Sequence, residues 1–353
     1  MTLGIAVVAP PLVTVVTDRR VSGATASDDY TKAGSLFYRD AQLAYTLAGL
    51  AAVPHLKFVT REWLAEALCV AGEGGAGLDE AMRRLAAACG PIVNIPGVSR
   101  ADRRLSILVA GFVFRDDAPV PIIYVVSNFQ RVDSPPAAQS RTHFEATKLE
   151  GEAANGVIYA IGSGMPLITS ADIAAITKAA SAKPLTLNAV GDTTASVIAR
   201  VSSADRKGLV GPNATSLVVP NGPGATIQTR YHADRATKTI PLPAAVYAEY
   251  GNEGAYVMLS TEYQGEGADA GRTLSVPVVP ANHLCPCGSG KKYKRCHRNQ
   301  DGIAGGLAGV RITTDWKIIA KPEDGSAIDF LSVGSGGAYN PPLRPSSAAT
   351  TKT

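Results

Sequence analysis

One residue near the beginning of the chain could supply both a nucleophile and a base. The sequence starts Met1-Thr2, and Asp18 follows the threonine after sixteen positions. If Met1 is removed, Thr2 carries a hydroxyl and a free α-amine on one Cα, and the amine can take the hydroxyl proton during attack on a carbonyl. That amine titrates at about pH 7.7–8.0, so it is a usable base near neutrality. Thr2 is therefore a candidate nucleophile, and the alternative is the ordinary Met-Thr start of many intracellular proteins.

The β-rich runs after Thr2 would bring Asp18 back beside it. Leu3–Val8 and Leu12–Thr17 are apolar runs separated by Pro10-Pro11, which predicts a hairpin. A hairpin places the end of its second strand next to the beginning of its first strand. The alternative for the aspartate is an ordinary turn carboxylate.

Two further positions flank the next expected strands. Lys32 precedes a strand at 35–39, and Gly49 follows a strand at 43–48. An amphipathic helix is expected after the glycine, over 53–69. The alternative for the lysine is an ordinary surface position.

The stretch from Thr2 to about Leu68 resembles the start of a proteasome β-type subunit and of its bacterial relatives, the N-terminal nucleophile (Ntn) hydrolases. That family has a leading threonine, Asp-Ser/Arg-Arg after the second strand, a lysine before the third strand, and an Ala-Gly-rich turn into the first helix. The matching positions here are Thr2, Thr17-Asp18-Arg19-Arg20, Lys32 and Leu47-Ala48-Gly49-Leu50-Ala51. The lysine lies about two positions early and the glycine a few positions late, both in turns, where changes of length are tolerated.

The resemblance implies a role for each of these residues. Thr2 would attack the substrate carbonyl, and its α-amine would be the base. Lys32 would be a buried cation that favours the ionised hydroxyl, and Asp18 would hold it in place. The Gly49 N–H would donate to the developing oxyanion, a contact that contributes roughly 3–4 kcal/mol in such sites.

Two supporting residues follow from the same resemblance. A strand expected at 157–161 leads into a Gly-Ser-Gly turn, in which Ser163 would support the threonine amine. The alternative is a plain glycine-rich turn. Asp205 lies in a loop expected at 202–211, where the family has a supporting aspartate followed three residues later by a serine. This chain has Gly208 in place of that serine.

The order of the expected elements agrees with the resemblance. Strands come first, then two helices, then strands, then two more helices and a strand, which suits two antiparallel sheets between helix layers. The later elements are expected at 105–114, 121–126, 170–182, 186–201 and 214–219. Ser134–Ala138 is expected as a surface loop. The resemblance implies an α+β fold, the four-layer αββα sandwich of the Ntn hydrolases, over roughly residues 2–221.

A group of side chains with metal-binding chemistry lies near the C-terminus. Cys285, Cys287, Cys296 and His297 fall within thirteen residues. Three thiolates and one imidazole suit a tetrahedral zinc site, and metal binding would supply the folding free energy of so short a segment. A disulfide is disfavoured, because the first two cysteines are too close in sequence to pair comfortably. The prediction is one structural zinc ion.

This segment closely resembles the SEC-C motif, found at the C-terminus of the preprotein translocase ATPase and on many other bacterial proteins. In the translocase the motif contacts a secretion chaperone and the ribosome, which implies a docking role here. Its basic residues are Lys291, Lys292, Lys294, Arg295 and Arg298. They could meet an acidic protein surface or rRNA phosphates. The alternative is a solvated face without a partner.

Composition is typical of a soluble globular protein of a reducing compartment, so a cytoplasmic location is expected. The chain has 353 residues, 46% hydrophobic and 18% charged, and its net charge of +4 forms no broad basic stripe for nucleic acid. Cys69 and Cys89 fall on apolar helical faces, as core residues do. The sequence lacks the ~18–20 consecutive apolar residues that cross a membrane, and its apolar start lacks the basic region of a signal peptide.

These patterns divide the chain and favour one function. The expected parts are a proteasome β-like Ntn-hydrolase domain at 1–221, a β-rich extension at 222–281, the SEC-C segment at 282–299, and an extension with a disordered tail at 300–353. The predicted activity is hydrolysis of a peptide, a protein or a small amide through an acyl-ester on Thr2, in a homo-oligomer like those of the family. The alternatives are a catalytically inactive proteasome-like scaffold and an adaptor whose SEC-C motif binds a protein or the ribosome.

Overall fold

The computed structural model describes residues 2–248 with short gaps, at 22–26, 29, 54–55, 57, 117, 133–135, 187, 223–224, 226 and 233–242. Farther along the chain it describes residue 295 and six short strands. None of the helices within these described parts is long and apolar enough to span a membrane.

The first two strands form the predicted hairpin. β1 (Leu3–Ala9) and β2 (Leu12–Asp18) pair antiparallel, with Gly4 opposite Thr17. Every residue of both strands is buried, because side chains on both faces of the hairpin pack against other layers. The nearly continuous apolar sequence of the two strands reflects that burial. The hairpin places Asp18, the last residue of β2, beside the start of β1.

Four more strands extend this hairpin into a six-stranded sheet, in the order β10-β1-β2-β11-β12-β16. The added strands are β10 (Ile158–Gly162), β11 (Ala214–Pro220), β12 (Gln228–His232) and β16 (Thr273–Leu274). Two register positions matter for the site, since Gly162 lies opposite Leu3 and Ala214 lies opposite Asp18. The turn after β10 and the loop before β11 therefore meet at the beginning of β1.

The second sheet has nine strands, in the order β19-β18-β14-β13-β3-β4-β7-β8-β9. They are β3 (Ala33–Tyr38), β4 (Ala41–Gly49), β7 (Leu105–Arg115), β8 (Ala118–Ser127), β9 (Glu145–Glu150), β13 (Ala244–Tyr247), β14 (Ala255–Leu259), β18 (Thr314–Lys321) and β19 (Leu331–Val333). β3 and β4 form a hairpin, so Lys32 and Gly49 lie at the same end of it. Both the extension expected at 222–281 and the one expected at 300–353 contribute strands to this sheet.

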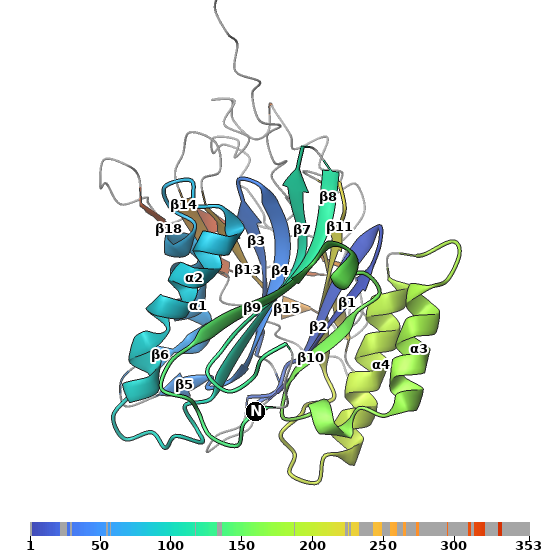
Figure 1. Ribbon diagram of the computed structural model, residues 1–353, viewed down its shortest axis with the longest axis horizontal. Helices are drawn as coiled ribbons and strands as arrows, with labels where there is room; N and C mark the ends of the chain where they lie inside the picture. Colours follow the sequence, from blue (N-terminus) through green and yellow to red (C-terminus); the bar gives the residue numbers. More distant parts are fainter. Residues whose placement is uncertain are drawn as a thin grey trace, which may run out of the picture.

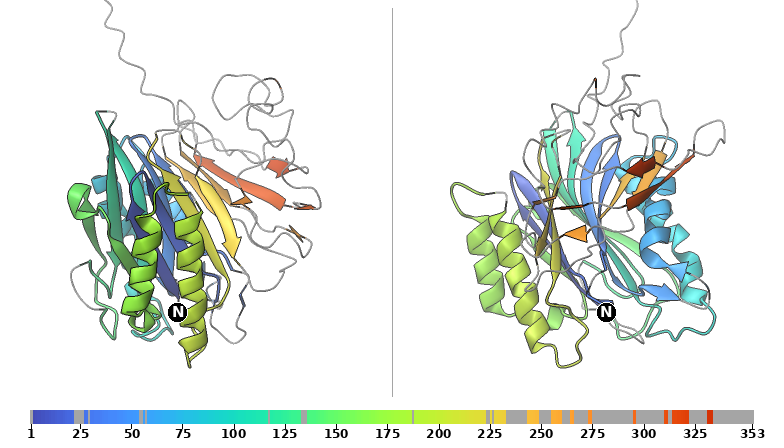
Figure 2. Two further views of the ribbon diagram at one scale, coloured as in Figure 1. Left: turned by 90° about the vertical axis from the view of Figure 1, so that its right-hand side faces the viewer. Right: turned by 180° about the vertical axis from the view of Figure 1, so that it is seen from behind.

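Two pairs of helices cover the outer faces of the two sheets (Figure 1, Figure 2). They are α1 (Thr60–Ala71) and α2 (Leu78–Ala88), and α3 (Ser170–Ala180) and α4 (Ala189–Ala204), with short 3-10 turns η2 (Gly90–Asn94), η3 (Gly151–Ala153) and η4 (Met165–Leu167). One buried cluster joins α1 and α2 to the nine-stranded sheet, a second joins the two sheets, and a third joins the six-stranded sheet to α3 and α4. The described residues thus form a mixed α+β fold of two packed sheets between two helix pairs.

Three local expectations need correction or addition. The helix expected at 53–69 begins only at Thr60, because β5 (Ala52–Val53) and β6 (Phe58–Val59) first pair with each other. The helix expected at 186–201 runs from Ala189 to Ala204, which shortens the loop before β11. Strand β9 was not expected, since its sequence Glu-Ala-Thr-Lys-Leu-Glu is largely polar and its residues are mostly half-buried. Cys69 of α1 and Cys89 at the end of α2 are buried in the core, as predicted.

A hydroxyl on β11, an imidazole on β12 and a carboxylate on α4 lie in a row. Ser216 Oγ lies 2.9 Å from His232 Nε2, and His232 Nδ1 lies 3.6 Å from Asp192 Oδ1. The order resembles a hydrolase triad, but Ser216 is 2% exposed, packs against Gly191 and is not among the residues that line the cavity beside Thr2. Arg230 pairs with the second Asp192 oxygen at 3.1 Å. The cluster therefore links α4 to β11 and β12. Burial lowers the pKa of His232 to about 4, although Asp192 opposes the shift.

This imidazole should make the fold sensitive to mild acid. His232 stays neutral in the fold down to about pH 4, but it is protonated below about pH 6.5 once the chain unfolds. Its contribution to the free energy of unfolding is complete above about pH 6.5 and is lost as the pH falls toward 4, by up to about 3 kcal/mol. Urea unfolding at about pH 7 and about pH 4.5 should therefore show a larger loss in the wild type than in His232→Gln. Equal losses in the two proteins would contradict this assignment.

Candidate active site

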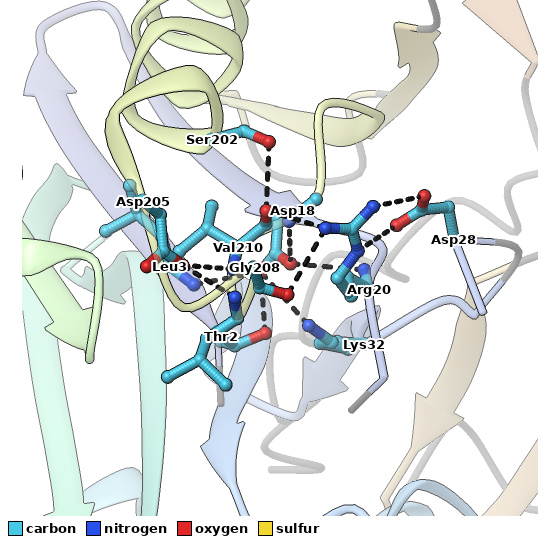
Figure 3. A network of polar contacts seen from close by, with 12 residues as sticks. Thr2, Leu3, Asp18, Arg20, Asp28, Lys32, Ser202, Asp205, Gly208 and Val210 are labelled. Carbon is cyan, nitrogen blue, oxygen red and sulfur yellow. Dashed lines mark hydrogen bonds and ion pairs between the residues drawn. The ribbon is translucent and has the colours of Figure 1, made fainter. Parts of the chain in front are cut away.

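A buried carboxylate at the end of β2 gathers the residues of the site (Figure 3). Asp18 is 0% exposed, and its two oxygens accept hydrogen bonds from four segments of the chain. The donors are Thr2 Oγ1 (2.6 Å), Leu3 N (2.8 Å) and Lys32 Nζ (3.0 Å) to Oδ1, and Arg20 N (3.1 Å) and Gly211 N (3.0 Å) to Oδ2. These donors replace the water that a buried carboxylate loses.

Lys32 and Asp18 form a buried ion pair that shares an oxygen with the Thr2 hydroxyl. The two charged side chains are 2% and 0% exposed, and Nζ lies 3.0 Å from Oδ1. Burial lowers the pKa of Lys32 below its usual value, while the charge and hydrogen bond of Asp18 oppose that shift. The site therefore holds a lysine that releases its proton more readily than an exposed lysine does.

The loop between α4 and β11 closes over Asp18, and Asp205 gives this loop its shape. The Asp205 carboxylate accepts three hydrogen bonds from the backbone of its own loop, which begins where α4 ends. The donors are Lys207 N (3.0 Å), Leu209 N (2.6 Å) and Val210 N (2.9 Å). Burial opposes ionisation of Asp205, but these donors prevail and lower its pKa. Farther along the same loop, the Gly211 N–H donates a hydrogen bond to Asp18.

Arg20 fastens the same loop to the strand that carries Asp18. Its guanidinium forms a two-point ion pair with Asp28, in which both N–O distances are 2.7 Å. A third guanidinium nitrogen donates to the carbonyl oxygens of Gly208 and Val210, at 3.2 and 3.4 Å. Gly211 has no room for a side chain, because a Cβ would lie 2.6 Å from Asp28 Oδ1. This close approach allows the Gly211 N–H to reach Asp18.

The turn after β10 packs directly on the main chain of Thr2. Gly162 has a φ of +99°, and a Cβ there would lie 2.1 Å from the Thr2 carbonyl oxygen, so only glycine fits. The Gly164 N–H donates to the same oxygen at 3.4 Å. Between the two glycines, the buried Ser163 hydroxyl has no hydrogen-bond partner among the residues that the structure describes. This turn therefore brings an unsatisfied hydroxyl close to Thr2.

Gly49 reaches the same place from the end of β4. Its φ is +114°, and a Cβ would lie 2.0 Å from the carbonyl oxygen of Arg104. Thr2, Lys32, Gly49 and Ser163 all line one cavity of about 920 Å³. Thr2 is 1% exposed and lies at the cavity wall with Asp18 behind it. Of the six residues expected at the site, four line the cavity, Asp18 contacts two of these four, and Asp205 holds the adjoining loop.

Two loops contribute to the lining of this cavity. The segment Ser134–Ala138, expected as a surface loop, provides Pro136, Ala137 and Ala138. The facing segment, 97–104, contributes five lining residues. Arg100 and Ser140 join the two loops through hydrogen bonds of 2.7 and 3.1 Å. These contacts connect segments distant in sequence, so no local pattern signals them.

Gln130 is another residue of the site without a sequence signal. It is 2% exposed, and its carboxamide donates to the Ala160 carbonyl at 2.8 Å and accepts from the Gly162 N–H at 3.4 Å. Gln130 follows β8 of the nine-stranded sheet, whereas its partners belong to β10 of the six-stranded sheet. It therefore joins the two sheets where the Ser163 turn begins.

The predicted metal ligands Cys285, Cys287, Cys296 and His297 lie outside the described residues. Among the residues that the structure does describe, no three His, Cys, Asp or Glu side chains are grouped so that they could hold a metal ion.

Comparison with protein families identifies one motif. Residues 282–299 match the SEC-C motif. The chain is similar to the protein translocase subunit SecA of Clostridium acetobutylicum, with 47% identity over 57 residues, covering 14% of this chain and 7% of that protein. It is also similar to SecA of Xylella fastidiosa, with 45% identity over 49 residues, covering 14% of this chain and 5% of that protein. The match thus spans less than a tenth of these relatives.

The solved structures to which the chain is similar include two β-subunits. One is Anbu (ancestral beta-subunit) from Yersinia bercovieri, with 14% identity and a TM-score of 0.41, covering 62% of this chain and 82% of that chain. The other is an Anbu Gly-1 mutant from Hyphomicrobium sp. strain MC1, with 13% identity and a TM-score of 0.39, covering the same shares. Both TM-scores are below 0.5, so the roles of residues in this chain are inferred from its own geometry.

Removing the charge of Asp18 should destabilise the protein strongly. Asp18→Asn keeps the shape of the side chain but leaves the Lys32 cation buried without its counter-charge, which costs about 3 kcal/mol in the free energy of unfolding. The measurement is urea unfolding at neutral pH. The matched control is Glu80→Gln on α2, where Glu80 pairs with Arg83 and Arg84 at exposed positions. That change should cost less than about 1 kcal/mol, and equal losses would refute the central place of Asp18.

Proposed function

We propose that this protein is an N-terminal-threonine amide hydrolase of the proteasome β type, acting through an acyl-ester on Thr2. One observation carries the proposal: the Thr2 hydroxyl (2.6 Å) and the Lys32 ammonium (3.0 Å) meet on one oxygen of Asp18, at the wall of a cavity of about 920 Å³. The cavity is of the size that binds small ligands and short peptides. The resemblance of the first 68 residues to the Ntn hydrolases supports the same assignment.

The reaction begins after removal of the residue before Thr2. The freed α-amine takes the hydroxyl proton while the oxygen attacks the carbonyl carbon of the substrate amide. The tetrahedral intermediate then breaks its C–N bond, and the proton passes from the ammonium to the departing amine. A water molecule, deprotonated by the same amine, cleaves the acyl-ester, which releases the acid and restores Thr2.

The neighbours of Thr2 prepare it for this chemistry. The Lys32 cation lies where it favours the ionised hydroxyl, and Asp18 holds Lys32 in place. The Gly49 N–H is the candidate donor to the oxyanion, because Gly49 lines the cavity with Thr2. The unsatisfied Ser163 hydroxyl is the candidate partner of the freed amine. Asp205 acts indirectly, through the loop that supplies Gly211 N–H to Asp18.

A second candidate function is a catalytically inactive scaffold of the same fold. The observation that favours it concerns the two residues expected to support the Thr2 amine. The Asp205 carboxylate accepts hydrogen bonds from three backbone amides of its own loop, and the Ser163 hydroxyl has no partner within the described residues. A protein with this function would not hydrolyse amides, and its SEC-C motif would be its working surface.

Substitution of Thr2 separates the two functions. Thr2→Ala should lower kcat/KM on a fluorogenic peptide amide at least about 10³-fold, because the nucleophile is lost, whereas Thr2→Ser should retain measurable activity. The matched control is Thr177→Ala on the exposed surface of α3, which should leave kcat/KM unchanged. Full activity in Thr2→Ala would exclude the proposed mechanism, and inactivity of the wild type with a free Thr2 would favour the scaffold.

The SEC-C segment is, in the same proposal, a zinc-stabilised docking element. Its match to the motif supports this role, and the donor set of three thiols and one imidazole suits zinc. The bound metal would hold a short segment in a fixed conformation. The five basic residues of the segment would then meet an acidic partner protein or the ribosome.

Metal analysis tests the zinc site. The purified full chain should contain one zinc ion per molecule, and Cys296→Ser should lower that content sharply, because a thiolate ligand is lost. Cys69→Ser is the matched control. It should leave the zinc content unchanged, because Cys69 is a buried core residue of α1. The measurement is inductively coupled plasma mass spectrometry. Equal zinc contents in both variants would refute this ligand assignment.

A further inference from the structure

We propose that the cavity beside Thr2 selects substrates whose acyl-side residue, the one that becomes esterified to Thr2, is bulky and apolar. This inference rests on the proposed hydrolase function and specifies its substrate class. Three observations support it: the apolar residues that line the cavity, the ion pairs and hydrogen bonds that already engage its charged groups, and the position of Thr2 at its wall.

Apolar side chains from several distant parts of the chain form most of the described wall. They include Leu47, Leu50, Val53, Val98, Phe129 and Leu209. A substrate side chain that enters among them exchanges water for apolar surface, which favours binding in proportion to the area buried. The wall therefore favours binding of an apolar substrate residue.

Small residues keep the cavity wide. Five alanines line it, namely Ala51, Ala52, Ala101, Ala137 and Ala138. Their short side chains leave the volume of about 920 Å³ that larger residues would fill. A cavity of this volume has room for a leucine or phenylalanine side chain together with neighbouring parts of the substrate.

The charged groups of the described lining already have partners. Lys32 is paired with Asp18, and Arg20 forms its two-point pair with Asp28. The Asp102 carboxylate accepts a hydrogen bond from the Ser99 hydroxyl, with an O–O distance of 2.6 Å. A charged substrate residue would have to compete with these contacts or lose hydration without a new partner.

Arg104 is the lining residue that could instead select an acidic substrate residue. Its guanidinium carbon lies 5.6 Å from the centre of the Phe129 ring, and its Nε donates to the Ala101 carbonyl at 2.7 Å. Arg104, Phe129 and Ala101 all line the cavity. These two contacts mean that the Arg104 charge already has partners within the protein. Selection of an acidic residue by Arg104 is the outcome that the test must be able to detect.

Peptide epoxyketones provide the test, because they form a stable ring only with a hydroxyl and a free amine on one terminal residue. Four probes share one peptide and differ in the residue next to the epoxyketone, which is Leu, Phe, Glu or Lys. The rate of adduct formation is followed by intact mass on the full chain with its terminus at Thr2. The Leu or Phe probe should react at least about tenfold faster than the Glu and Lys probes, which corresponds to about 1.4 kcal/mol.

The outcomes separate this inference from the function on which it rests. A fastest reaction with Glu or Lys, or four rates within about threefold of one another, would overturn the apolar preference but leave the Thr2 nucleophile established. Absence of an adduct with all four probes on a folded chain would refute the hydrolase function and this inference with it.

A variant of the wall checks that the cavity itself sets the preference. Ala51→Glu places a carboxylate on the lining and should lower the ratio of the Leu rate to the Lys rate by at least about tenfold. Ala88→Glu, at an exposed position of α2 away from the described lining, should leave the ratio unchanged. An unchanged ratio in Ala51→Glu, or the same change in both variants, would overturn the proposal.

Discussion

The burial of the Asp18 carboxylate is the constraint on which the rest of the site depends. A charged carboxylate removed from water is costly unless it is paired and fully hydrogen-bonded. The fold meets that cost with donors from four segments: the beginning of β1, the residues after β2, the residue before β3 and the loop before β11. Each segment is held by different strands, so the two sheets must be assembled before the carboxylate is satisfied. The geometry at Thr2 is a consequence of that assembly.

A buried ion pair is a poor device for stabilising a fold, because desolvation offsets much of its Coulomb attraction. In the proposed mechanism the Asp18–Lys32 pair serves reactivity, since burial lowers the pKa of Lys32 next to a hydroxyl at a cavity wall. The cluster under α4 gives an instructive contrast. It also aligns a hydroxyl with a titratable group, but Ser216 packs against Gly191, whereas Thr2 lines a cavity. Access, and not the set of residue types, distinguishes the two clusters.

Local patterns predicted much of the site, and contacts between distant segments account for what they missed. The β1–β2 hairpin could be predicted because its strands and turn are adjacent, and it alone brings Asp18 to Thr2. The SEC-C motif was likewise contained in one short segment. The late start of α1 depends on β5–β6 pairing, and the cavity wall at Pro136 depends on a loop distant in sequence. Gln130 joins two sheets, so neither its neighbours nor its spacing indicates its position.

The central claim is that Thr2 becomes a terminal nucleophile supported by Asp18 and Lys32. The most direct measurement is the intact mass of the full-length protein before and after treatment with one peptide epoxyketone. We expect a chain that begins at Thr2 and gains a single adduct, and no adduct in Thr2→Ala. A chain that still carries residues before Thr2, or an adduct that persists in Thr2→Ala, would rule out Thr2 as the nucleophile.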